Sequence, residues 1–169
     1  MTQPIVDADG RTRTFSWSDP LATASAVRGL SGLEAIRMVA AGELPPPPIA
    51  ELLGMEITHV DRGHVIFSLD PAEWMYNPIG SVHGGVAATV LDSSLGCAVH
   101  TTLDAGVGYT TSDLQVRYVR ALSSSSGRVL AESKVVHSGR RLATAEGRLF
   151  AEGDGKLFAH ASTSCLILG

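Results

Sequence analysis

The sequence has few of the residues that support disulfide, redox or metal chemistry. Only 2 of its 169 residues are cysteine, and Cys97 and Cys165 stand in apolar surroundings without metal-ligand or redox spacing. We therefore expect two buried thiols in a reducing compartment. The sequence also shows no zinc-ligand cluster and no serine-triad order, so we expect neither a metal nor a cofactor.

An excess of positive charge and a long apolar run are missing as well. The formal net charge is -4 and the basic residues form no long run, which argues against nucleic acid or an anionic membrane as the main partner. No window approaches the roughly 20 apolar residues of a membrane span, and residues 1–15 lack a basic start followed by an apolar stretch. We expect a cytoplasmic protein without a membrane partner.

The composition that is present, 44% hydrophobic and 18% charged, is typical of one soluble domain with a core. Asp19 before Pro20, and a capping box of Ser31 with Glu34, predict two short helices. Residues 12–17 alternate as a strand or an ordered extension would. The prolines at 45–48 predict a stiff extended connector. We therefore divide the chain into an N-terminal extension with short helices, 1–43, and a main domain, 44–169.

Hydrophobic periodicity places one long helix among strands in the main domain. Residues 55–60 and 64–69 flank a short turn and predict a hairpin. From Gly84 to about Thr101 there is no proline and the apolar residues recur at helical spacing, which predicts a buried helix. An antiparallel meander is expected after it, with strands at 114–119, 128–136, 142–151 and 157–166. The order predicts an α+β fold with one sheet wrapped around one helix.

Two glycines open the predicted long helix and suggest an anion or carbonyl site. The run from Asn77 to Gly85 ends in His83-Gly84-Gly85, so backbone amides without side-chain bulk point out of a helix N-terminus. The structural alternative is that the glycines only permit a tight turn. His83 is a candidate acid/base or orienting group, although a lone histidine is more often structural.

Asp92 is the only side chain between Gly84 and Val99 that is charged at neutral pH. A carboxylate in an apolar helix needs a partner or a function, because burying it unpaired costs several kcal/mol; the alternatives are a solvent-facing Asp or one bonded to a neighbouring hydroxyl. Eight residues of helix separate Gly84 from Asp92 by about 12 Å, so they cannot flank the same carbonyl carbon. A site that uses both residues therefore predicts a two-fold dimer with two shared sites.

The pattern Asn77-x5-His83-Gly84-Gly85 followed by Leu91-Asp92 resembles the signature of PaaI-type hotdog-fold acyl-CoA thioesterases, and the likeness extends over about residues 44–166. Residues 42–54 and 139–143 resemble two further segments of that family. The resemblance implies the hotdog fold, an antiparallel sheet around one central helix. It also implies homodimers with shared sites that assemble as a dimer of dimers, a homotetramer.

Roles for individual residues also follow from the resemblance. The Gly84 amide would polarise the thioester carbonyl, and Asp92 of the partner subunit would act as nucleophile or general base. Asn77 would position water or substrate, His83 would support the loop, and Thr111 would place a hydroxyl near the acid. Guanidinium groups suit CoA phosphates, and the expected substrate-binding residues are Gly85, Ser112, Arg120, Gly139, Arg140 and Arg141.

Two other activities fit the same fold. A hotdog enoyl-CoA hydratase or dehydratase could use His83 with Asp92, and a non-catalytic acyl-CoA-binding protein would have no need for Asp92. The Asn77-x5-His-Gly-Gly loop favours hydrolysis of an acyl-CoA to free acid and CoA, where CoA is part of the substrate. The resemblance suggests an aromatic acyl group such as phenylacetyl, with a medium-chain aliphatic group as the alternative.

Overall fold

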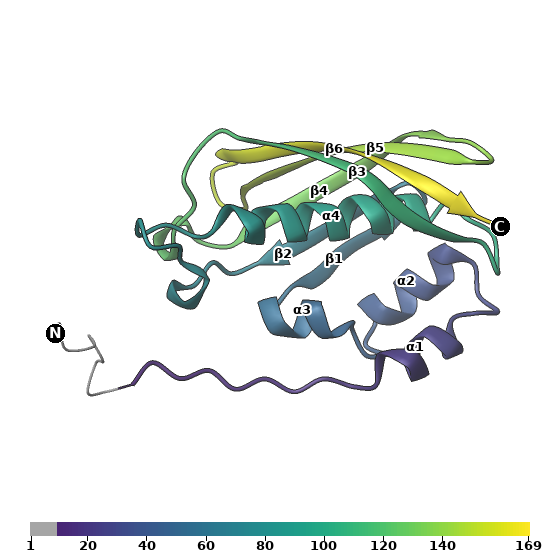
Figure 1. Ribbon diagram of the computed structural model, residues 1–169, viewed down its shortest axis with the longest axis horizontal. Helices are drawn as coiled ribbons and strands as arrows, with labels where there is room; N and C mark the ends of the chain where they lie inside the picture. The colour runs from purple at the N-terminus through teal and green to yellow at the C-terminus, as the bar shows by residue number, and fades with distance from the viewer. Residues whose placement is uncertain (1–9) are drawn as a thin grey trace, which may run out of the picture.

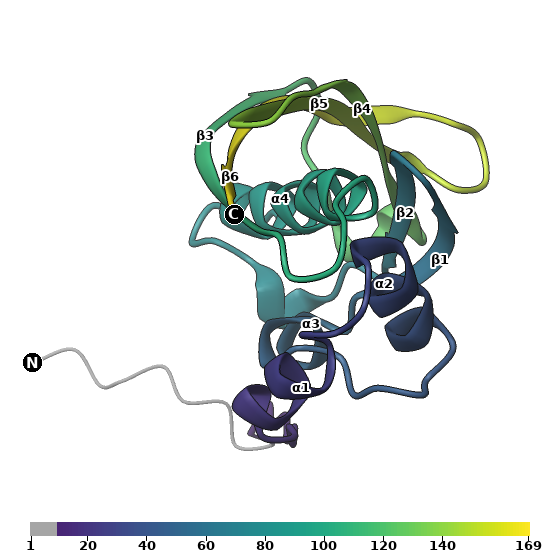
Figure 2. The same cartoon turned by 90° about the vertical axis from the view of Figure 1, so that its right-hand side faces the viewer.

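The structure, a computed structural model that describes residues 10–169, is organised around one long helix. Helix α4, Gly84–His100, lies on the concave side of a six-stranded antiparallel sheet (Figures 1 and 2). The strands are β1 Glu56–Asp61, β2 His64–Leu69, β3 Gly108–Tyr118, β4 Val129–Ser138, β5 Leu142–Ala151 and β6 Leu157–Leu168. The predicted α+β hotdog fold is therefore confirmed, and the central helix begins at the predicted residue.

Helix α4 is stable because the sheet encloses its apolar surface. Val90, Leu91, Leu95 and Val99 are fully buried beneath the strands, and each such side chain contributes about 1.5–3 kcal/mol relative to an exposed one. The absence of proline keeps the backbone ladder intact over 17 residues. The helix thus forms the core of the fold and presents side chains from fixed positions along one axis.

The strand order β1-β2-β4-β5-β6-β3 differs from the predicted meander at one strand. Strands β4, β5 and β6 follow one another as expected, but β3 pairs with β6 at the far edge of the sheet. This part of the prediction is wrong because α4 carries the chain across the concave face before β3 begins. Strand β3 also starts earlier than expected, at Gly108, where it pairs with Leu168 at the end of β6.

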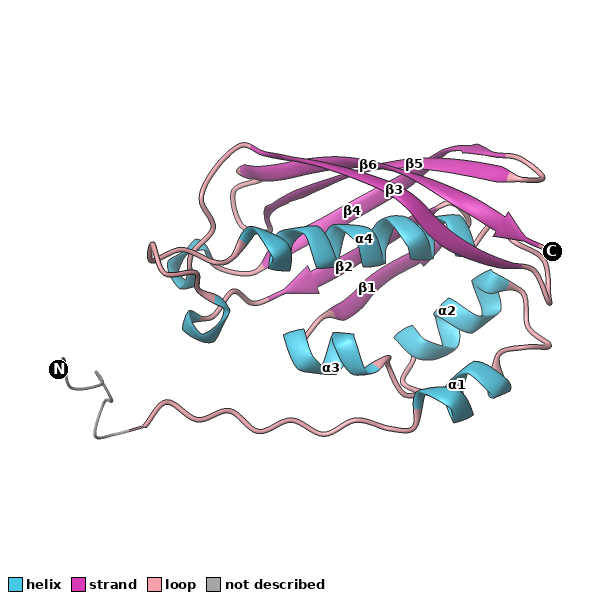
Figure 3. Ribbon diagram, viewed as in Figure 1, coloured by secondary structure: helices cyan, strands magenta, loops and turns pink. Residues whose placement is uncertain are grey.

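Three helices precede β1, one more than the sequence predicted (Figure 3). Helix α1, Pro20–Ala26, is capped by Asp19, and α2, Gly32–Ala40, begins with the predicted capping box of Ser31 and Glu34. The extra helix α3, Pro48–Leu53, replaces the end of the predicted connector. Proline is favoured at the first helical position, where no amide donor is needed, so Pro48 starts the helix.

The remaining elements are short. Two 3-10 turns, Glu73–Met75 and Ser124–Ser126, interrupt the loops that precede α4 and β4. The stretch 12–17 is extended but unpaired, so it is not a strand. Within residues 10–169, no helix is long and apolar enough to cross a membrane. Part of the predicted N-terminal extension, residues 1–9, lies outside the described residues, and the boundary after residue 43 stays a prediction.

Candidate active site

Asp92 lies at the middle of α4 and accepts a hydrogen bond from a neighbouring strand. The Thr111 hydroxyl on β3 donates to Asp92 Oδ1 at 3.0 Å. The adjacent Ser112, which was expected to bind substrate, lies at a β-bulge and is exposed, and its hydroxyl donates to the Ser164 carbonyl at 3.0 Å. Of the two hydroxyls, the structure therefore brings Thr111 to the acid and directs Ser112 elsewhere.

The carboxylate of Asp92 opens into a cavity of about 560 Å³, which we call the Asp92 cavity. Apolar side chains of α2, α3, β1 and β2 line it together with Asp92, Cys97, Tyr109 and Thr111, and the polar residues Glu56 and Ser93 also contribute. Burial, together with the nearby charge of Asp92, raises the pKa of the Cys97 thiol to about 12. Burial likewise raises the pKa of Tyr109 well above its ordinary value. The surroundings of Asp92 are thus poorly solvated, which strengthens electrostatic interactions there.

The N-terminus of α4 offers a backbone donor. His83 is the N-cap residue, and its Nδ1 accepts a hydrogen bond from the Gly85 amide at 2.9 Å. Within residues 10–169 the Gly84 amide has no hydrogen-bond partner, while the Gly84 carbonyl accepts one from the Tyr118 hydroxyl at 3.0 Å. An amide in the first helical turn has no partner within the helix and carries the positive end of the helix dipole. Gly84 can therefore donate to a carbonyl oxygen.

Asn77 holds the loop before α4 in shape. Its Oδ1 accepts hydrogen bonds from the amides of Ile79 at 3.1 Å and Ser81 at 3.2 Å, and its Nδ2 donates to the Ser81 hydroxyl at 3.1 Å. The His83 amide in turn donates to the Met75 carbonyl at 2.8 Å. These bonds give Asn77 a supporting position beside Gly84. Its role in positioning water or substrate stays a prediction.

A second cavity of about 330 Å³, the Gly84 cavity, lies at this end of α4. Asn77, His83, Gly84, Tyr118 and Arg120 line it with several apolar residues. Arg120 donates from Nη1 to the Leu157 carbonyl at 2.6 Å, so its guanidinium is held at the rim of the sheet. The Gly84 cavity and the Asp92 cavity share no lining residue. One chain therefore does not bring Gly84 and Asp92 to a common point.

The remaining predicted substrate-binding residues lie apart from both cavities. Gly139, Arg140 and Arg141 form the turn between β4 and β5, which the Gly139 amide closes by donating to the Leu142 carbonyl at 2.9 Å. Both arginines are exposed. Within one chain they are not grouped with Arg120, and their role in binding CoA phosphates stays a prediction.

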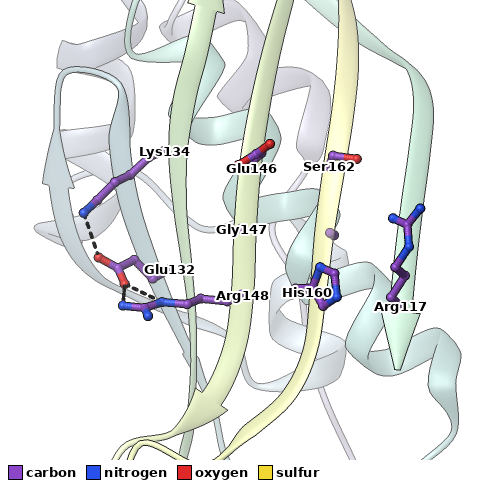
Figure 4. Close-up of a pocket in the computed structure, with 9 residues that line it drawn as sticks. Arg117, Glu132, Lys134, Glu146, Gly147, Arg148, His160 and Ser162 are labelled. Carbon is purple, nitrogen blue, oxygen red and sulfur yellow. Dashed lines mark hydrogen bonds and ion pairs between the residues drawn. The ribbon is translucent and has the colours of Figure 1, made fainter. Parts of the chain in front are cut away.

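A third depression, of about 540 Å³, lies on the outer face of the sheet (Figure 4). There Arg148 donates to Glu132 at 2.8 Å and Lys134 lies 3.3 Å from the same carboxylate. The Arg148 hydrogen bond, with help from Lys134, lowers the pKa of Glu132 to about 2. Alternation along β4 and β5 turns these charged side chains away from α4. None of the predicted catalytic residues contributes to this depression.

Of the cavity residues, Tyr118 was not singled out from the sequence, and Cys97 was expected only as a buried thiol. Tyr118 closes over Gly84 from a strand 34 residues away, and no local pattern marks such a contact. Cys97 lies five residues after Asp92, a spacing that does not place two side chains on the same face of a helix, so helical periodicity did not mark it as a neighbour of Asp92. Among residues 10–169 there is no group of three or more His, Cys, Asp or Glu side chains that could hold a metal ion.

Comparison with known proteins finds a family that this chain resembles. Residues 79–158 match the family model described as the thioesterase superfamily, and this segment contains both Gly84 and Asp92. Over this segment, which is just under half of its length, the chain is similar to the thioesterase superfamily. It is accordingly an enzyme of the thioester-hydrolase class.

Individual relatives and solved structures are similar to this chain over a larger part of its length. A 1,4-dihydroxy-2-naphthoyl-CoA hydrolase of Listeria monocytogenes is 28% identical over 94 residues, which are 54% of this chain and 73% of that protein. A phenylacetic acid degradation-related protein of Ralstonia eutropha superposes with a TM-score of 0.69 at 29% identity, over 77% of this chain and 97% of that one. The PaaI protein of E. coli shares the fold, with a TM-score of 0.70 at 20% identity over 83% and 96% of the two chains.

Proposed function

We propose that this enzyme hydrolyses an aromatic or medium-chain acyl-CoA to the free acid and CoA, at sites shared between two subunits. The observation that carries the proposal is the separation of its two chemical groups. A carboxylate held by Thr111 lies in one cavity, and a free helix-terminal amide lies in another.

Each group suits one half of the reaction. The Gly84 amide donates to the thioester carbonyl oxygen and stabilises the negative charge that develops there. Asp92 acts as nucleophile or as general base for water, and the Thr111 hydrogen bond orients its carboxylate. The thiolate then leaves with the electrons of the broken C–S bond. His83, whose Nδ1 is occupied as an acceptor, supports the amide loop in this scheme.

A dimer joins the two halves. Because about 12 Å of helix separates Gly84 from Asp92, the acid must come from the partner subunit in an isologous dimer with two equal sites. Further pairing of dimers into a homotetramer is part of the proposal and is measured by light scattering on the purified protein.

CoA recognition is supported by charge near Gly84. Arg120 lines the Gly84 cavity, and an arginine there can bind a phosphate with two hydrogen bonds. The Listeria relative is named as a CoA hydrolase, which agrees with a CoA thioester as substrate. Arg140 and Arg141 would meet the nucleotide only from a neighbouring subunit.

The first test measures CoA release from a panel of aromatic and aliphatic acyl-CoAs by wild type and Asp92→Asn. Binding of a non-hydrolysable thioether analogue is measured in parallel. We expect the variant to bind the analogue and to lose several orders of magnitude in kcat. Asp104→Asn makes the same chemical change at an exposed position after α4 and should keep the wild-type rate.

Two outcomes would overturn the proposal. If wild type binds acyl-CoA but releases no CoA from any member of the panel, the proposed substrate class is wrong. Full activity of Asp92→Asn would remove Asp92 from the mechanism.

Shared sites are tested by mixing two inactive variants. Gly84→Pro removes the amide donor and Asp92→Asn removes the acid, so a heterodimer of the two has one doubly altered site and one intact site. After the subunits are exchanged, about a quarter of wild-type activity should return. No recovery, with subunit exchange verified by mass spectrometry, would place both groups of each site on one chain.

A further inference from the structure

The Asp92 cavity has a wall that the superfamily match does not include. Ile36, Val39 and Ala40 of α2 line it, followed by Pro46 and Pro47 of the connector. All of these residues lie outside the matched segment 79–158. We propose that α2 forms the end wall of an acyl pocket and sets the size of the acyl group that the enzyme accepts. This inference rests on the proposed function.

The cavity has the chemistry of an acyl pocket. Opposite α2 it is lined by the apolar Met55, Ile57 and Phe67 of the first hairpin and its lead-in, and the exposed, charged Glu56 also contributes to the lining. A volume of about 560 Å³ lies within the range of roughly 300–1,000 Å³ that is usual for small-molecule pockets. Phosphates and amides would lose hydration in such a lining. The occupant is therefore the apolar acyl group rather than the pantetheine or the nucleotide.

Asp92 and Thr111 lie in the same lining and fix the direction of the substrate. When the thioester carbon lies beside Asp92, the acyl group attached to it occupies this cavity, and the sulfur points toward the Gly84 cavity of the partner subunit. The length of an acyl group that fits is then the distance from Asp92 to the first side chain that blocks it. Helix α2 supplies that side chain, and Val39 is its half-buried residue in the lining.

Helix α2 is docked firmly enough to act as a wall. The Gly32 amide donates to the Leu103 carbonyl at 3.1 Å, and a Cβ on the buried Gly32 would overlap the His100 carbonyl. Ala35 and Ile36 are buried against the rest of the fold. The helix therefore rests on the C-terminal end of α4, as Figure 2 shows, and positions Val39 relative to Asp92.

Two substitutions change the wall in opposite directions. Val39→Phe extends the side chain into the cavity, and Val39→Ala withdraws it. Since one methylene in an apolar pocket changes kcat/KM by about 10-fold or more, Val39→Phe should lower the ratio of long-chain to short-chain kcat/KM by at least that factor. Val39→Ala should move the preferred chain length upward by one or two carbons.

The control is Met38→Phe, which also adds an aromatic ring to α2 but at a half-buried position outside the cavity lining. It should leave the chain-length ratio unchanged. Thermal unfolding of all three variants identifies any that fail to fold. If both Val39→Phe and Val39→Ala are folded and active but keep the wild-type ratio of long-chain to short-chain kcat/KM, α2 does not form the end wall of the pocket.

A binding experiment separates this inference from the proposed function. Affinities of acyl-CoA thioether analogues, from two to twelve carbons, are measured for wild type and Val39→Phe by calorimetry. One outcome is that wild type hydrolyses no acyl-CoA, while Val39→Phe selectively weakens binding of the longer analogues. In that case the acyl pocket is supported and the hydrolytic function is wrong. If wild type hydrolyses acyl-CoA and the affinity depends on acyl-chain length in the same way in both proteins, the hydrolytic function is supported and the role of α2 as the end wall is wrong.

Discussion

Replacing Gly84 by proline removes one hydrogen-bond donor from the proposed site with little damage to the fold. Gly84 is the first residue of α4, where proline is favoured because the amide has no partner within the helix. His83 has φ -59° and ψ 132°, the extended conformation that a residue before proline prefers. The His83 cap to the Gly85 amide does not involve the altered nitrogen.

The matched control is Gly84→Ala, which keeps the amide. A Cβ at this position would lie 3.2 Å from Cζ of Tyr118, and both variants carry it. Tyr118 is 56% exposed, so its ring can move by the few tenths of an ångström required. The difference between the two variants then reports the amide alone.

We expect kcat of Gly84→Pro to be about 100- to 1,000-fold below that of Gly84→Ala, which corresponds to roughly 3–4 kcal/mol of lost transition-state stabilisation. Release of CoA from the best acyl-CoA of the panel is followed at saturating substrate, and circular dichroism verifies that α4 is retained. Equal kcat values for the two folded variants would refute the role of the Gly84 amide.

Three further predictions follow from individual contacts. Thr111→Val should lower kcat by about 10-fold or more through the loss of a hydrogen bond to a charged group, whereas Thr110→Val, at the exposed neighbour, should not; equal rates would show that the contact is not used. The pKa of Glu132 falls from 4.5 to about 2 on folding. The ionised carboxylate therefore stabilises the folded state fully above about pH 4.5, and this stabilisation is lost as the pH falls toward 2. The free energy of unfolding should therefore drop by about 1–2 kcal/mol over this window, allowing for the exposure of its partners. Glu132→Gln should flatten that part of the curve in urea titrations, and an unchanged curve would contradict the linkage. Cys97, with a pKa of about 12, should react with a disulfide reagent at pH 8 far more slowly than a free thiol, and rapid labelling of the native protein would contradict this.

The elements that were predicted correctly are those whose cause is local. The capping box of Ser31 and Glu34 forms as expected, because its partners are three residues apart. The first hairpin and the bounds of α4 also agree with prediction, since alternation and helical spacing repeat within short windows. The extra helix α3 was missed because a run of prolines normally indicates extended chain, and only Pro48 had a helical position available.

Within the candidate site, residue type and spacing marked the groups, and only the family resemblance placed Thr111 near the acid. His83, Gly84 and Asp92 could be selected by type and spacing along one helix, and the 12 Å argument predicted that they serve different sites. The β-bulge at Ser112 decides that the Thr111 hydroxyl rather than the Ser112 hydroxyl contacts Asp92, and no sequence pattern predicts that bulge. Tyr118 and the α2 wall were invisible for the same reason, because each depends on a contact between distant segments.

The sequence by itself determined the long apolar helix, its glycine-rich start and the single acid along it, because these depend on residue type and on a repeat of 3.6 residues. The tertiary structure alone decided that β3 lies at the far edge of the sheet, that Thr111 donates to Asp92 across 19 residues, and that α2 lines the Asp92 cavity. Those features arise from packing between segments far apart in the chain, and the free energy of such contacts depends on shape and burial that a local pattern does not contain.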